Sequence, residues 1–66
     1  MEKEVIENKL RRIPHKFFFV NGKSFKTMHN NKENAITMLM EMSTFSDNIL
    51  LNYNKWSEEY VVEMVL

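Results

Sequence analysis

The sequence predicts a small α+β protein in which an antiparallel sheet of about four strands carries the middle helix across one face. Two observations support this class. Segments with helical spacing of apolar residues alternate with segments rich in phenylalanine, valine and isoleucine. An Asn-Gly dipeptide between two apolar segments is typical of a tight hairpin. The expected order is α-β-β-α-β-β, in a single domain over residues 1–66, because two domains would each be too short to bury a core.

Residues 2–12 form the first expected helix. Its apolar residues follow an i, i+4 stripe, and its acidic residues precede its basic ones, which suits the helix dipole. Pro14 ends the helix, because the residue before a proline avoids the helical region. We expect this helix to cover part of the second sheet face or to pack on the sheet edge.

Residues 15–28 form the expected hairpin, with Asn21-Gly22 as a two-residue turn. A turn of this length sets Phe18 opposite Phe25, and opposed residues share a face. One face then carries Phe18, Val20 and Phe25, and the other carries Phe17, Phe19 and Met28. Because both faces are apolar, the hairpin needs a cover on each side.

The second expected helix begins at Asn30, an N-cap with Glu33 three residues later as in a capping box, and ends near Ser43. Its apolar residues cover more than half of its circumference. Met38 lies outside the main apolar stripe, so we expect Met38 or Met40 to be exposed or to lie in a contact.

Two further strands complete the sheet. Residues 49–53 form the first, residues 54–57 a loop, and residues 60–66 the second, with Leu51 opposite Tyr60. Ser57-Glu58-Glu59 could instead begin a helix, but three valines in the last segment favour a strand.

The charges are divided between the two halves of the chain. Residues 1–32 hold eight basic and three acidic residues, and residues 33–66 hold one basic and six acidic residues. The halves therefore carry formal charges of +5 and −5. This asymmetry indicates either an acidic partner for the basic half or neutralisation of one half by the other.

Several functional classes have little support in the composition. The chain has no cysteine, which fits a reducing compartment, and no long apolar segment or charged-then-apolar leader, so we expect a cytoplasmic protein. Its two histidines do not supply a metal site, and a single glycine does not form a phosphate loop. We therefore expect no enzyme activity, metal or cofactor.

The excess of apolar surface predicts a protein that binds another protein. We expect a non-enzymatic regulator or inhibitor of a larger cytoplasmic protein. The Asn- and Lys-rich composition resembles that of phage or mobile-element accessory proteins, which act on host or defence proteins. The expected partner-binding residues are Phe17, Phe19, Lys26, Met38 and the loop residue Trp56. Trp56 is either an anchor for a partner or a lid on the core, and its polar neighbours favour the anchor.

Self-association is a second expectation, through Phe17 and Phe19 or through the edge of the last strand. The alternative function is an RNA- or single-stranded-DNA-binding module that uses the basic aromatic hairpin of residues 9–32. Its contacts would come from Arg11, Arg12, Lys16, Lys23 and Lys26.

Overall fold

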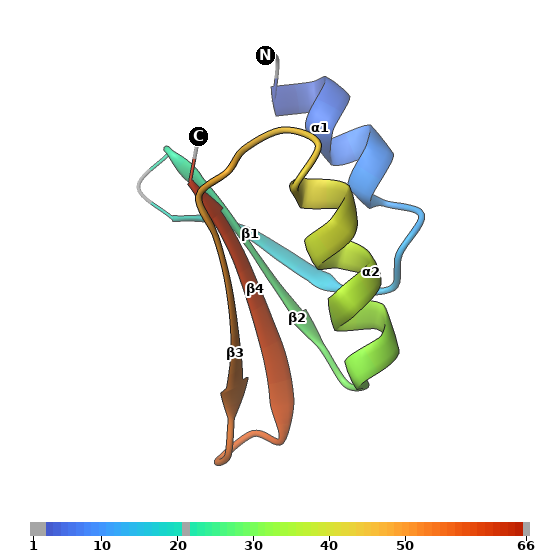
Figure 1. Ribbon diagram of the computed structural model, residues 1–66, viewed down its shortest axis with the longest axis vertical. Helices are drawn as coiled ribbons and strands as arrows, with labels where there is room; N and C mark the ends of the chain where they lie inside the picture. Colours follow the sequence, from blue (N-terminus) through green and yellow to red (C-terminus); the bar gives the residue numbers. More distant parts are fainter. Residues whose placement is uncertain (1–2, 21, 66) are drawn as a thin grey trace.

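The computed structural model describes residues 3–20 and 22–65 (Figure 1). The elements in chain order are α1 (Lys3–Leu10), β1 (Lys16–Val20), β2 (Ser24–His29), α2 (Lys32–Met42), β3 (Ile49–Asn54) and β4 (Glu59–Val65). The predicted α+β class is confirmed. The first helix is shorter than expected at its end, because it stops at Leu10, and Glu2 lies outside the described residues.

The four strands form one antiparallel sheet in the order β1-β2-β4-β3. The last strand, β4, therefore lies in the interior of the sheet and pairs on both sides. The expectation that a dimer forms through the edge of the last strand is wrong for this reason. The edge strands are β1 and β3.

The β1–β2 hairpin differs from its expected register by one residue. Val20 pairs with Ser24, which leaves a loop of residues 21–23 in place of a two-residue turn. Phe25 consequently pairs with Phe19 rather than with Phe18, and a shift of one residue exchanges the two faces of a strand. Asn21 and the side chains of residues 17–20 lie outside the described residues.

The β3–β4 hairpin differs from its expected register by two residues. Leu51 pairs with Val62 rather than with Tyr60, because the loop comprises residues 55–58 instead of 54–57. Side chains alternate with a period of two, so this shift keeps the expected residues on the expected face.

One apolar core lies between the helices and the sheet. Its buried members are Ile6, Leu10, Ile13, Phe25, Ala35, Met38, Met42, Val62 and Met64. Because α1 contacts α2 and supplies three of these residues with the turn that follows it, both helices lie on the same side of the sheet (Figure 1). The expectation that α1 covers the second face or the edge is therefore wrong, and within residues 3–20 and 22–65 that second face carries no helix.

Helix α2 begins one residue later than expected. Asn31, not Asn30, is the N-cap: it has an extended backbone, and its side-chain oxygen accepts a hydrogen bond of 2.8 Å from the backbone N–H of Asn34. The helix faces the sheet with Ala35, Met38 and Met42. Met38 is fully buried, which contradicts its assignment to a partner-binding surface, whereas Met40 is 66% exposed.

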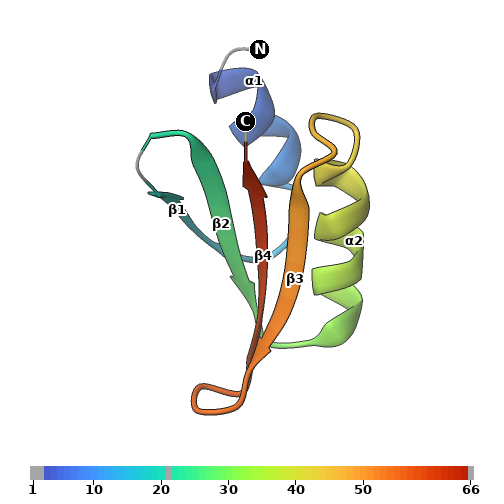
Figure 2. The same cartoon turned by 60° about the vertical axis from the view of Figure 1, so that its left-hand side comes forward.

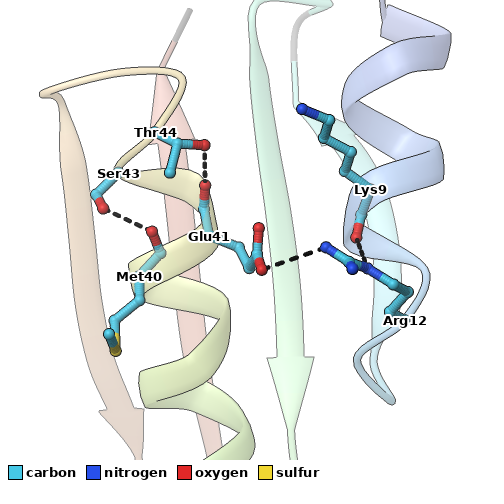
Figure 3. Close-up of polar contacts among 6 residues, drawn as sticks. All are labelled: Lys9, Arg12, Met40, Glu41, Ser43 and Thr44. Atoms are coloured by element: carbon cyan, nitrogen blue, oxygen red, sulfur yellow. Dashed lines mark hydrogen bonds and ion pairs between the residues drawn. The ribbon is translucent and has the colours of Figure 1, made fainter.

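Polar contacts join the turn after α1 to α2 and close the end of α2 (Figure 3). Arg12 lies 3.4 Å from the Glu41 carboxylate and also donates to the backbone carbonyl of Lys9. The Ser43 and Thr44 hydroxyls donate to the carbonyls of Met40 and Glu41 at 2.6 and 2.7 Å. These bonds satisfy carbonyl groups that have no partner within the helix.

Candidate functional site

The helix-free face of the sheet carries an open groove of about 470 Å³. Alternate residues of three strands form its floor, because their neighbours in sequence face α2 and the core. The residues that line the groove include Lys26, Leu50, Asn52, Trp56, Val61 and Glu63.

The turn between β3 and β4 holds Trp56 at one end of this groove. The Asn54 side-chain oxygen accepts hydrogen bonds from the backbone N–H groups of Trp56 (3.0 Å) and Ser57 (3.3 Å). Glu58 then adopts a left-handed conformation with φ of 54°. The turn projects beyond the first residues of α2, as both views of the ribbon show (Figure 2).

The Trp56 side chain is almost entirely in water, with 98% of its surface exposed. Leu50 and Tyr53 nearby are about half exposed. Tryptophan offers more apolar area than any other side chain, and single buried tryptophans often dominate protein interfaces. The expectation that Trp56 is exposed rather than a lid on the core is confirmed, and its contact with a partner stays a prediction.

The floor of the groove carries one positively charged and one negatively charged side chain. Lys26 on β2 lies across from Glu63 on β4 in the strand register, and both side chains are partly buried. The Ser24 hydroxyl donates to the Glu63 carboxylate at 3.4 Å. The groove thus combines the apolar side chains of Leu50, Val61 and Trp56 with one positive and one negative side chain in its floor.

The structure brings together only part of the predicted partner-binding set. Lys26 and Trp56 line the same groove. Phe17 and Phe19 belong to β1, with β2 between them and β4, and the placement of their side chains lies outside the described residues. Leu50 and Val61 were not among the predicted partner-binding residues. Strand alternation nevertheless puts them on the other face of the sheet from their sequence neighbours Leu51 and Val62, which face the core.

The basic residues of the alternative function have acidic neighbours. Arg11 lies 3.9 Å from Glu7, and Lys16 lies 3.9 Å from Glu59. With the Arg12–Glu41 pair, three of the five predicted nucleic-acid contacts form ion pairs, and a fourth, Lys26, is the cross-strand neighbour of Glu63. Two of these pairs join the basic half of the chain to the acidic half, which supports neutralisation between the halves.

The two histidines lie near each other at the sheet end beside α2, with ring centroids 6.1 Å apart. His29 is buried: its Nδ1 lies 3.1 Å from the Pro14 carbonyl oxygen and its Nε2 lies 2.9 Å from the Thr27 hydroxyl. Burial lowers the pKa of His29 below its ordinary value, the bond to Pro14 opposes this effect, and the nearby His15 adds to it. Both ring nitrogens of His29 are thus occupied by the protein itself.

Among residues 3–20 and 22–65, no group of three or more histidine, aspartate or glutamate side chains is arranged to hold a metal ion. Neither α1 nor α2, the two helices within these ranges, combines the length and apolarity needed to cross a membrane. No protein-family model, curated protein or solved structure matches the chain.

Proposed function

We propose that this chain is a non-enzymatic regulator or inhibitor that binds a larger protein through Trp56 and the helix-free face of the sheet. The single observation that carries the proposal is the 98% exposure of Trp56 on a turn whose backbone is fixed by Asn54. Because the backbone of this turn is already fixed, covering Trp56 with a partner costs little further backbone entropy.

The neighbouring residues support the same role. Leu50 and Val61 extend the apolar contact area along the groove, and Lys26 and Glu63 offer polar partners in its floor. A protein that binds without reacting changes its target by occupying a surface, which is why regulation or inhibition is the proposed outcome.

The experiment compares Trp56→Ala with Met40→Ala. Met40 is an exposed apolar residue on α2, so its truncation is a matched control on another part of the molecule. The wild-type chain and both variants are immobilised and incubated with an extract of the native host cell, and the retained protein is purified and titrated. We expect Trp56→Ala to weaken binding by about thirtyfold or more, the loss of about 2 kcal/mol typical of a central contact.

The titration also reports directly on the site. Trp56 is the only tryptophan in the chain, so its red-shifted emission should move to shorter wavelength when the target binds. Equal affinity of the wild type and Trp56→Ala would disprove the proposal. Retention that is lost steeply with salt, and on neutralising Arg11, Arg12, Lys23 and Lys26, would favour nucleic acid instead.

A further inference from the structure

The outer edge of β3 lacks the features that normally protect an edge strand. Its sequence, Ile-Leu-Leu-Asn-Tyr-Asn, has neither a charged residue nor a proline. The other edge strand, β1, begins with Lys16, which lies beside Glu59. Exposed edges without charges tend to pair with another strand.

The hydrogen-bonding pattern identifies the free backbone groups of this edge. The carbonyl of Asn48 accepts a bond of 2.9 Å from the N–H of Val65, so Asn48 is oriented toward β4. Orientation alternates along an antiparallel strand, so Leu50, Asn52 and Asn54 also face β4. The backbone groups of Ile49, Leu51 and Tyr53 therefore point to the outer edge.

We infer that a second copy of this chain pairs with β3 in antiparallel fashion, with Leu51 at the two-fold axis. An axis perpendicular to the sheet keeps both sets of helices on the same side, so residues of the same face oppose one another. In this register Leu51 opposes Leu51 of the second copy and Ile49 opposes Tyr53. All three residues with outward backbone groups are then paired.

The charges that flank β3 support this register. Asp47 precedes the strand and Lys55 follows it, and both residues are exposed. With Leu51 at the axis, Asp47 of each copy opposes Lys55 of the other. Shifting the register by two residues in either direction removes this match. Within the described residues, neither Asp47 nor Lys55 makes an ion pair in the single chain.

The dimer has a continuous sheet of eight strands and goes beyond the proposed function, since it pairs the backbone edge of β3, although Tyr53 and Lys55 also line the groove. Charge exchange tests it without touching the core. We expect Asp47→Lys or Lys55→Asp to weaken the dimer by about tenfold, because each creates two like-charge pairs in place of two opposite ones. The double variant restores both opposite pairs, and with them the wild-type dissociation constant.

The measurement is sedimentation equilibrium of the full chain from micromolar to millimolar concentration. Lys23→Asp is the matched control, because Lys23 is an exposed lysine in the loop of the other hairpin. This variant should dimerise as the wild type does. A wild-type chain that stays monomeric throughout the series would overturn the inference.

Amide hydrogen exchange measured over the same series identifies the paired edge. The amides of Ile49, Leu51 and Tyr53 should become protected as the dimer forms, whereas those of Leu50 and Asn52 are already protected by β4. A dimer that protects the β1 amides and leaves that of Leu51 unchanged would also overturn the inference, since it would place the contact at the opposite edge.

Discussion

The two hairpins of this sheet reverse direction through the same unusual backbone conformation but with different residues. In the β1–β2 loop, Gly22 has φ of 67°, a left-handed conformation that glycine adopts without strain. In the β3–β4 turn, Glu58 has φ of 54°, and a residue with a side chain is strained there. The strained turn is the one that presents Trp56, and strain of this kind concentrates at functional sites.

Burial separates β2 of the first hairpin from β3 of the second. On β2, Phe25, Thr27 and His29 are buried, so the strand from the first hairpin forms part of the core. On β3, every residue is partly or fully exposed. Strand β2 therefore contributes mainly to the core, as Val62 and Met64 of β4 do, whereas β3 and the turn after it expose the edge and the tryptophan that we propose as interaction surfaces.

The largest expected effect on stability is that of truncating Phe25 on β2, for which Leu50 on β3 is the comparison. Phe25→Ala should cost about 3–5 kcal/mol, because the ring is fully buried and leaves a cavity. A chain of this size has about 3–5 kcal/mol of stability, so this variant should be largely unfolded at room temperature. Leu50→Ala, on the exposed face of β3, should change stability by less than about 0.5 kcal/mol. Urea denaturation followed by circular dichroism measures the free energy of unfolding of both variants. Comparable losses of stability would contradict the difference between β2 and β3.

The next largest effect comes from replacing the left-handed residue of each turn, Gly22 in the first hairpin and Glu58 in the second. Gly22→Val should cost about 1–3 kcal/mol through backbone strain alone, since no atom lies within 4 Å of the position that its Cβ would occupy. Glu58→Gly should have the opposite sign. It relieves about 1–2 kcal/mol of strain, less the entropy that glycine gains in the unfolded chain, for a net gain of about 0.5–1 kcal/mol.

Thermal melting of both variants measures this pair of effects. If Glu58→Gly lowers the melting temperature, the β3–β4 turn is not strained, and the contrast between the hairpins fails. If Gly22→Val has no effect, the left-handed conformation of the β1–β2 loop is wrong.

The same two hairpins show what the sequence could predict. The Asn-Gly dipeptide indicates where the chain reverses, but it does not show that the loop has three residues. This one extra residue shifts the register, so that Phe25 shares a sheet face with Phe19 instead of Phe18. The second hairpin has no such dipeptide. Its faces were nevertheless predicted correctly, because Leu51 and Val62 each belong to an alternating apolar pattern that tolerates a shift of two residues.

The site was predicted in part for a similar reason. Trp56 stood out because its neighbours are polar and continue no apolar stripe. Met38 was misplaced because helical spacing alone does not show which part of a broad apolar arc faces the sheet. The edge of β3 required the strand order, which places β4 between β2 and β3 and depends on long-range pairing that no local pattern encodes.

The smallest expected effect is the pH dependence that His29 gives to the first hairpin. Burial lowers its pKa in the folded chain below the ordinary value of 6.5 that it regains on unfolding. Below about pH 6.5 the unfolded chain therefore binds a proton that the folded chain does not, and stability falls as the pH falls toward the folded pKa. Between about pH 7.5 and about pH 6 the loss should be less than about 1 kcal/mol, because the unfolded histidine is only partly protonated over that interval.

Urea denaturation of the wild type and of His29→Gln and His15→Gln at these two pH values tests this effect. His29→Gln should lower stability at both values, because it disturbs the bonds to Pro14 and Thr27, but it should flatten the dependence on pH. His15→Gln should keep most of the dependence, since burial is the main cause of the lowered pKa of His29 and the charge of His15 a lesser one. Stability that rises as the pH falls to about 6 would mean that the folded chain binds the proton more tightly, and that the bonds of the protonated ring to Pro14 and Thr27 outweigh the cost of burying its charge.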